Sequence, residues 1–257
     1  MPQAKPPISR AGGKARLAKH ILPLIAARPH TCYVEPFGGG GAILLAKPPS
    51  SIEVYNDIDS GLINAFRQIR NHPDELVRLL EFRVASREEH QAAQNRQPET
   101  ELLAAADYLY RHWNKFGDDE TSYGVRTKSG GSSSRSRQAT LSALSALNQR
   151  LDKVNIEHRD WAQIFDTYDR PHTLFFCDPP YLGNDTAYKA WKLSDWVDFR
   201  EALRDLKGQW IVTSSAHPEI HDLFHDCQKF PIVRSKGIEN RPGKAKSPTY
   251  EELLITP

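Results

Sequence analysis

The chain has 257 residues, of which 39% are hydrophobic and 26% charged, and its formal net charge at pH 7 is +2. Such a composition excludes a chain that is disordered throughout, and the length fits one large domain or one domain with an insertion. No apolar run is long enough for a transmembrane helix, and the first residues lack the apolar core of a signal peptide, so we expect neither membrane insertion nor export.

The first part of the chain alternates predicted helices with short strands. Hydrophobic residues at helical spacing predict a helix over 14–27, and an alternating segment predicts a strand over 32–37. Four glycines follow, Gly38 to Gly41, and 42–46 has the pattern of a helix or a buried segment. A second strand is predicted over 52–59, with acidic residues at its end.

The middle of the chain is predicted to be mainly helix and loop. Helical patterns cover 61–83 and 101–116, and a further one covers 139–154. Between them, 117–138 is polar and rich in glycine and serine. Because the region as a whole is too long for one crossover connection, we expect an inserted helical subdomain over 61–154.

Strands and helices alternate again in the last part of the chain. Strands are predicted over 155–160, 173–177 and 209–215, helices over 196–208 and 217–227, and two strands joined by a basic loop over 230–257. This order predicts an α/β fold with a Rossmann-like, mostly parallel sheet and a C-terminal antiparallel strand. The sheet domain would comprise 1–60 and 155–257, with the helical subdomain inserted between them.

Unusual residues follow three of these strands, at the edge where open α/β sheets bind ligands. Glycines in the segment EPFGGGG, Glu35 to Gly41, permit a tight turn and the close approach of a ligand. Asp57 follows Gly38 by about 20 residues, the spacing at which an acid binds ribose hydroxyls. Alone, the glycines favour a structural turn and Asp57 fits a helix cap equally well. Together they favour an adenosine-type ligand.

The third strand end, Asp178-Pro179-Pro180-Tyr181, is the most specific of the three. Two consecutive prolines donate no hydrogen bonds to a sheet, so the preceding strand must end there. A structural turn that caps the strand would explain the prolines. It would not explain why a carboxylate and a phenol also stand at this strand end.

Cysteines and histidines give no sign of a disulfide or metal site. Cys32, Cys177 and Cys227 are widely spaced, which is typical of free thiols in a reducing cytosol. His217, His221 and His225 have helical spacing without a set of cysteine or acidic ligands, so we expect a surface helix and no metal.

Taken together, five motifs of the sequence resemble those of the Dam-type DNA adenine-N6 methyltransferases. They are RAGGK (Arg10 to Lys14), EPFGGGG, YNDID (Tyr55 to Asp59), DPPY and EELLI (Glu251 to Ile255). The motifs occur in the order of that family and cover nearly the whole chain. The resemblance implies transfer of a methyl group from S-adenosylmethionine to N6 of a flipped adenine in a specific double-stranded DNA sequence. It also implies that the protein acts in the cytoplasm, either of its own bacterial cell or, as a phage protein, of the host cell.

The same resemblance implies roles for individual residues. For the cofactor these are Arg10, Gly12, Gly13, Lys14, Glu35, Pro36, Phe37, Gly38, Gly40, Asp57, Asp160 and Asp178. Asp57 would bind the ribose and Asp160 the adenine ring of the cofactor. In the catalytic segment Asp178, Pro179, Pro180 and Tyr181, the Asp178 carboxylate and the Pro179 carbonyl would accept the hydrogens of the target amino group, and Tyr181 would stack on the flipped base.

Basic and aromatic residues in two segments are candidates for DNA binding. They are Tyr123, Arg126, Lys128, Arg135, Arg137, Arg234, Lys236, Arg241 and Lys244. The family keeps its target-recognition elements in the first segment, for which a solvated linker is the alternative. That segment does not match the pattern of members that methylate GATC, so the sequence predicts no particular target.

Other functions remain open at this point. Cytosine N4 or an RNA base could be the methyl acceptor, or the chain could be a non-catalytic DNA-binding relative. A nicotinamide-dependent oxidoreductase has no use for DPPY and needs a different glycine spacing. The expected partners are double-stranded DNA, with or without a cognate restriction endonuclease, and the expected state is a monomer or weak dimer.

Overall fold

The computed structural model describes residues 4–8, 10, 12–116, 119–124, 137–183, 191–235 and 249–257. Its main sheet contains β1 (Cys32–Glu35), β2 (Ile52–Asn56), β5 (Val154–Glu157), β6 (Thr173–Cys177), β7 (Gln209–Ser215), β8 (Gln228–Ser235) and β9 (Thr249–Thr256). The seven strands lie in the order β5-β2-β1-β6-β7-β9-β8. Neighbouring strands are parallel except where β9 pairs with β7 and β8. The predicted Rossmann-like sheet with a C-terminal antiparallel strand is therefore confirmed.

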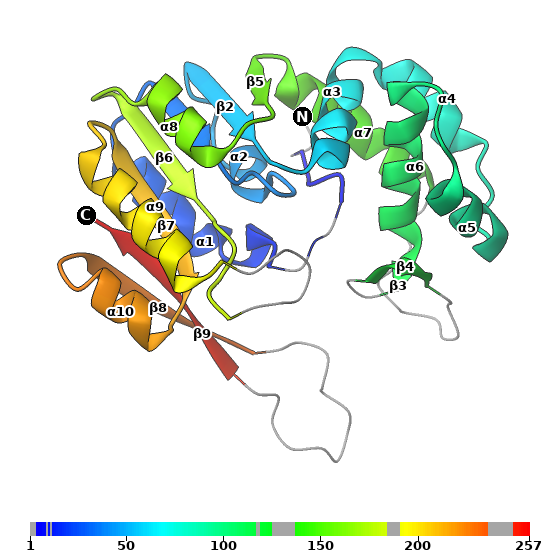
Figure 1. Ribbon diagram of the computed structural model, residues 1–257. Coiled ribbons are helices and arrows are strands. Elements are labelled where there is room, and N and C mark those ends of the chain that lie inside the picture. The colour runs from blue at the N-terminus through cyan, green and yellow to red at the C-terminus, as the bar shows by residue number, and fades with distance from the viewer. Residues whose placement is uncertain are drawn as a thin grey trace.

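Helices cover both faces of this sheet and extend beyond one end of it (Figure 1). They are η1 (Lys14–Arg16), α1 (Ala18–Ala26), α2 (Ala42–Ala46), α3 (Ser60–Asn71), α4 (Pro73–Glu81), α5 (Arg87–Asn95), α6 (Glu101–Asn114), α7 (Arg137–Leu151), α8 (Trp161–Tyr168), α9 (Leu193–Asp205) and α10 (Pro218–Leu223). Two short strands, β3 (Lys115–Phe116) and β4 (Asp119–Tyr123), form an antiparallel pair at the end of α6.

Alternating residues of the central strands face two different hydrophobic layers, as the period of two in a strand requires. Tyr33 and Leu174 belong to a core that includes residues of α1 and α2. Val34 and Phe175 belong to a second core, which is completed by residues of α8, α9 and α10. The sheet is thus buried on both sides, and its loops at the strand ends are left to bind ligands.

Helices α3 to α7 gather beyond the end of the sheet that β5 forms (Figure 1). In this group α3 packs against α6 and α7, and α5 packs against α6. Leu62, Tyr108 and Leu144 of these helices belong to the same continuous core as Tyr33. The division into a catalytic domain and an inserted recognition subdomain remains a prediction.

Several elements differ from the sequence-based expectation, and α8, between β5 and β6, was not expected. The helix expected over 61–83 is two helices, because Pro73 lacks an amide hydrogen and begins a new helix after His72. The helix α6 ends at Asn114, so that β3 replaces the last two residues of the helix expected over 101–116, and β4 lies where a polar loop was expected. Helix α5 was not expected, since only His90 and Ala93 of its residues are buried and its apolar pattern is weak.

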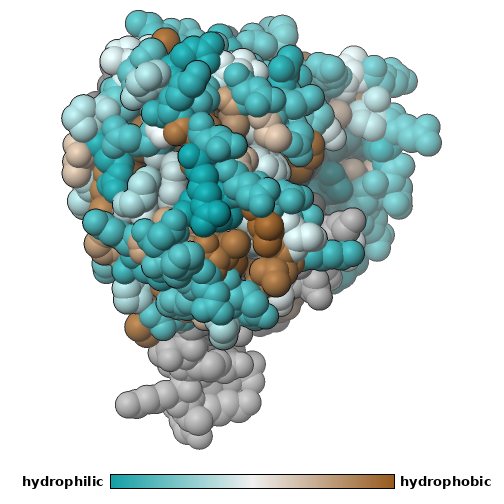
Figure 2. Space-filling view, turned by 60° about the vertical axis from the view of Figure 1, so that its left-hand side comes forward, coloured by the Kyte–Doolittle hydropathy of each residue, from teal (hydrophilic) through white to brown (hydrophobic). Residues whose placement is uncertain are grey.

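Two further features concern the outside of the molecule. The face turned forward in Figure 2 is mainly hydrophilic, with small hydrophobic areas. In the part of the chain that the structure describes, no helix combines the length and the apolar character needed to cross a lipid bilayer.

Candidate active site

The glycine segment and the DPPY segment follow adjacent parallel strands. Strand β1 lies between β2 and β6 and is parallel to both. From β1 the chain continues to β2 and β5 on one side and later to β6 and β7 on the other. The loops after β1 and β6 therefore flank the point where the strand order reverses, which is where open α/β sheets bind ligands.

The glycine loop is fixed by close contacts with the end of β2. The amide of Gly38 donates to the carbonyl oxygen of Asn56 over 2.7 Å. A Cβ atom at Gly38 would lie 2.2 Å from the ring of Tyr55, so no other residue fits there without displacing the tyrosine. Gly39 and Gly41 have positive φ angles of 51° and 71°, a conformation that side chains disfavour. The loop thus needs glycine for both space and backbone shape.

Asp57 joins this loop to the second strand. Its Oδ2 accepts a hydrogen bond from the amide of Gly39 over 2.8 Å, and its Oδ1 accepts one from the amide of Asp59 over 2.9 Å. Burial raises the pKa of Asp57, while these two amides and the nearby Arg10 guanidinium oppose the shift. The structure thus brings Asp57 to the glycine loop, and ribose binding stays a prediction.

The catalytic candidate Asp178 has a hydrogen-bond donor at each carboxylate oxygen. Thr213 donates from its hydroxyl to Oδ1, and the Nζ atom of Lys14 lies 2.9 Å from Oδ2. The same ammonium donates to the carbonyl oxygen of Gly12 over 2.5 Å and lies 4.9 Å from the centroid of the Tyr181 ring. The RAGGK and DPPY segments, which are distant in sequence, therefore meet at one carboxylate.

Tyr181 is half-buried, and its hydroxyl oxygen is fully buried. This hydroxyl lies near Asp178, Glu252 and Thr213. Burial, together with the charges of Asp178 and Glu252, raises the pKa of Tyr181 well above its usual value. The phenol therefore stays neutral at physiological pH. Of the two prolines, Pro179 is buried and Pro180 is half-buried.

Arg10 makes contacts that the sequence did not predict. Its guanidinium donates to the carboxylate of Asp59 and to the hydroxyl of Tyr108 on α6. Nearby, the indole of Trp113 donates to the carbonyl oxygen of Pro7 over 2.8 Å. Helix α6 therefore holds the segment that precedes Gly12. Tyr108 and Trp113 were missed because aromatic residues in an amphipathic helix look like ordinary core.

Glu35 and Pro36 are buried at the end of β1. The hydroxyl of Tyr33 donates to Oε1 of Glu35 over 2.8 Å, and burial raises the pKa of this carboxyl to about 8. The structure thus places the Glu35 side chain in the core below the glycine loop. The cofactor role implied for these two residues stays a prediction.

Two other cofactor candidates lie near the second hydrophobic core, against which Phe37 packs and which Trp161, the residue after Asp160, also contacts. The Phe37 ring packs edge-on against Trp191, with the centroids 5.4 Å apart. Asp160 is exposed and caps α8 by accepting from the amide of Ala162 over 2.9 Å. Trp161, which follows Asp160, packs against the same Trp191 with a centroid separation of 6.1 Å. A flat aromatic ligand would meet rings here, and the adenine contact of Asp160 stays a prediction.

The DNA-binding candidates are described only in small part. Tyr123 lies on β4, where its ring packs against His90 with centroids 5.7 Å apart. Arg137 begins α7 and Arg234 lies on β8, but the described parts do not include their side chains. The remaining candidates, Arg126, Lys128, Arg135, Lys236, Arg241 and Lys244, lie outside the described residues.

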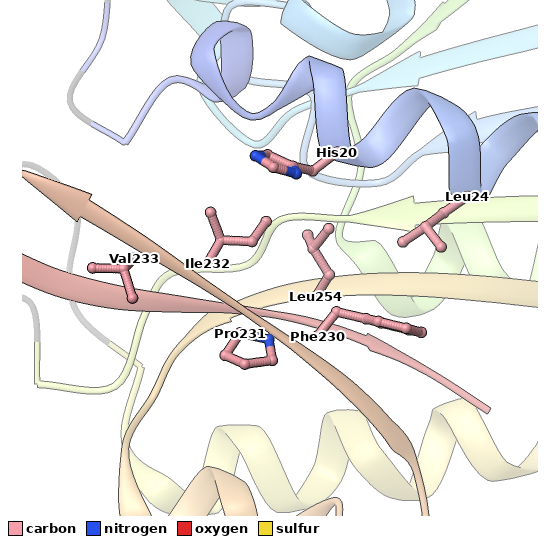
Figure 3. A pocket seen from close by; sticks show the side chains of 7 residues that line it. All are labelled: His20, Leu24, Phe230, Pro231, Ile232, Val233 and Leu254. Carbon is pink, nitrogen blue, oxygen red and sulfur yellow. The ribbon is translucent and has the colours of Figure 1, made fainter.

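A pocket lies at the opposite edge of the sheet from β5, between α1 and the strands β8 and β9 (Figure 3). It is lined by His20, Leu24, Phe230, Pro231, Ile232, Val233 and Leu254. None of these residues follows the carboxyl end of a parallel strand, and of them only Leu254, in EELLI, belongs to one of the motifs above. The pocket is therefore separate from the candidate active site.

Sequence comparisons relate the chain to known DNA methyltransferases. Residues 11–239 match the family model of the D12 class N6 adenine-specific DNA methyltransferases. The chain is also 25% identical to the Type II methyltransferase M1.LlaDCHI of Lactococcus lactis subsp. cremoris, over 89% of this chain and 88% of the relative. A crystal structure of an rRNA methylase from Streptococcus thermophilus aligns with 96% of this chain and 99% of its own. Its TM-score of 0.37 and identity of 9% are too low to bear on fold or activity.

The family match spans most of the chain and includes the glycine segment, Asp57 and DPPY. It confirms the resemblance drawn from the motifs and the expected adenine specificity. Members of this family are enzymes that methylate DNA, and S-adenosylmethionine is the methyl donor that the family implies. The chain belongs to the D12 class N6 adenine-specific DNA methyltransferase family.

Proposed function

We propose that Asp178 and the main-chain carbonyl of Pro179 accept the two hydrogens of the adenine N6 amino group during methyl transfer. The observation that carries this proposal is the placement of Asp178. Its carboxylate follows β6, beside the strand that ends in the glycine loop, and it contacts the segment around Gly12 through Lys14. An acceptor for the amino group thus lies next to the predicted cofactor loop.

The amino group needs these acceptors because its lone pair is delocalised into the adenine ring. Two acceptors that bind its hydrogens direct the lone pair out of the ring plane and toward the methyl group. The new bond forms between N6 and the methyl carbon, the bond from that carbon to sulfur breaks, and N6 releases one proton through Asp178 to solvent. Since φ is fixed at a proline, the carbonyl of Pro179 is oriented before the base arrives.

S-adenosylmethionine supplies an activated methyl group whose leaving group is a neutral thioether. The residues present fit such a cofactor, because a Cβ atom at Gly39 would meet only open space and the Asp57 carboxylate is held at the amide of the same residue. Asp57 would hold the ribose, Asp160 would contact the adenine ring, and Phe37 would contact the cofactor as part of the glycine loop. A neutral leaving group needs no Lewis acid, so the proposed reaction uses no metal.

The target base enters the site by leaving the DNA duplex. Its N6 atom cannot reach a carboxylate at a strand end while the base is stacked, and unstacking costs a few kcal/mol. The face of the neutral Tyr181 ring offsets part of this cost by stacking on the flipped base. The basic residues of the two candidate segments grip the phosphates of the flanking duplex.

The biological setting is proposed from the relative. M1.LlaDCHI is a Type II methyltransferase, so we propose that this enzyme protects DNA in a restriction-modification system with a cognate endonuclease. It would act in the cytoplasm as a monomer or weak dimer.

The test compares Asp178→Ala with wild type, using methyl-labelled S-adenosylmethionine and duplex DNA of random sequence. The DNA is digested to nucleosides and the label is located. We expect label in N6-methyldeoxyadenosine, a loss of about a thousandfold or more in rate for the variant, and cofactor affinity within about twofold of wild type. Asp198→Ala, which removes an exposed acid on α9, is the matched control. Wild-type turnover by Asp178→Ala would reject the proposed role, and label in cytosine would reject the adenine assignment.

A further inference from the structure

We propose that Thr213 is a positioning residue for methyl transfer, which holds the Asp178 carboxylate at the angle required to receive the adenine amino group. The inference rests on the role proposed for Asp178. It adds a residue on a different strand, outside the sequence motifs that identify the family. Its basis is a contact from the neighbouring strand that fixes one carboxylate oxygen.

The contact arises from the pairing of two parallel strands. Val212 of β7 is the partner of Cys177, the last residue of β6. Thr213 therefore comes next to Asp178, the first residue after the strand. Its side chain is completely buried, and its hydroxyl donates to Oδ1 of Asp178. The hydroxyl is thus a donor built into the sheet beside the carboxylate.

Thr213 and Lys14 contact different oxygens of the Asp178 carboxylate. The Lys14 ammonium lies 2.9 Å from Oδ2, and the Thr213 hydroxyl bonds to Oδ1. A carboxylate oxygen can accept two hydrogen bonds, so even with the Tyr181 hydroxyl beside Asp178 the carboxylate keeps an acceptor position for a substrate hydrogen. Donors at both oxygens prevent rotation of the carboxylate while leaving it able to accept.

The two donors differ in how firmly they are placed. Threonine is branched at Cβ and therefore restricted about χ1, and Thr213 sits in a strand that is paired on both sides. Lysine reaches its partner through a long side chain with several rotatable bonds. The orientation of the carboxylate therefore depends chiefly on Thr213.

Loss of this orientation affects turnover rather than binding. A misplacement of about 1 Å of a reacting group costs on the order of a hundredfold in rate. The cofactor loop and Asp57 do not contact Thr213 through any hydrogen bond that the structure describes. Removal of the hydroxyl alone should therefore lower kcat and leave cofactor affinity unchanged.

The experiment compares Thr213→Val, which removes the hydroxyl and keeps the shape, with Thr213→Ser, which keeps the hydroxyl. The matched control is Thr173→Val. Thr173 is a buried threonine at the opposite end of β6, and its hydroxyl donates to the carbonyl oxygen of Tyr168 over 2.8 Å. Single-turnover rates, steady-state kcat and the Kd values for S-adenosylmethionine and DNA are measured for each variant.

We expect Thr213→Val to lower kcat about 10- to 100-fold with both Kd values within about twofold of wild type. Thr213→Ser should recover most of the rate, and Thr173→Val should stay near wild type. Wild-type kcat in Thr213→Val, or an equal loss in Thr173→Val, would overturn the inference. If Thr213→Val does not fold, Thr213→Ala against Thr213→Ser makes the same comparison, and equal rates for these two would overturn it. Asp178→Ala in the same series separates a failure of this inference from a failure of the catalytic role itself.

Discussion

The ammonium of Lys14 lies 2.9 Å from Oδ2 of Asp178, so that a residue near the start of the chain supplies the charge partner of the catalytic candidate. Lys14 is buried, and it also bonds to the carbonyl oxygen of Gly12. Its position 4.9 Å from the Tyr181 centroid places a cation at the ring that is proposed to receive the base. The segment around Gly12 is therefore part of the proposed catalytic centre as well as a candidate for cofactor binding.

The change Lys14→Met should lower methyl transfer by about tenfold or more. Methionine keeps much of the length of the side chain but removes the ammonium, which leaves the Asp178 carboxylate without its charged partner. Steady-state kinetics and cofactor binding by calorimetry measure the effect. Lys19→Met, at an exposed position of α1, is the control for loss of one positive charge. An unchanged rate in Lys14→Met would show that the ion pair plays no part in turnover.

The parts of the site that the sequence predicts are those in which local chemistry is unusual. Two prolines after an apolar strand locate the end of β6, and the four glycines locate the loop after β1. Parallel pairing then implies that these ends lie side by side, and the structure confirms it. Asp57 was found by the same reasoning, because its distance from the glycines is that of a ribose-binding acid.

The parts that the sequence does not predict depend on contacts between distant segments. Thr213 lies in QWIVTSS, an ordinary strand sequence, and only the register of β7 on β6 brings it to Asp178. Tyr108 has the pattern of a core residue on α6, and its bond with Arg10 follows from how α6 packs. Helical spacing and strand alternation describe single elements, so they contain no information on such pairs.

Tyr108 provides a second prediction, because it links α6 to the segment that contains Arg10. Its hydroxyl accepts from Arg10 and donates to Oδ2 of Asp59 over 3.2 Å. The change Tyr108→Phe removes both bonds and keeps the ring. We expect the Kd for S-adenosylmethionine to rise about fivefold, since the bond to Arg10 is the one that reaches the proposed cofactor segment and loss of one such bond costs about 1 kcal/mol. Isothermal titration calorimetry measures it.

Tyr110→Phe is the matched control for this change. Tyr110 lies on the same helix and is also buried, but its hydroxyl donates to the carbonyl oxygen of Val84 over 2.7 Å, away from the site. Its loss should reduce thermal stability by a similar amount without altering cofactor affinity. If the two variants bind the cofactor equally well, α6 does not position the segment around Arg10.

Glu35 provides a prediction about pH, because the pKa of its carboxyl differs between the folded and the unfolded protein. Burial raises the pKa of its carboxyl from 4.5 to about 8, although the Tyr33 hydroxyl donates to it. Between these values the folded state holds a proton that the unfolded state has released. This group therefore lowers the free energy of unfolding as pH rises from about 4.5 to about 8.

The change Glu35→Gln replaces the carboxyl by a neutral group of the same shape and removes this dependence. Measured by urea denaturation from pH 5.5 to 8.5, the variant should gain stability relative to wild type as pH rises, by an amount on the order of a few kcal/mol.

Glu53→Gln is the contrasting control. The Lys47 and Arg150 hydrogen bonds hold the pKa of Glu53 below its usual range despite burial, so its contribution to stability is present throughout this range and is lost only at lower pH. That variant should be less stable than wild type throughout this range. If Glu35→Gln and wild type instead give parallel curves, the carboxyl of Glu35 is ionised in the folded protein and a cation must approach it more closely than Lys47 does.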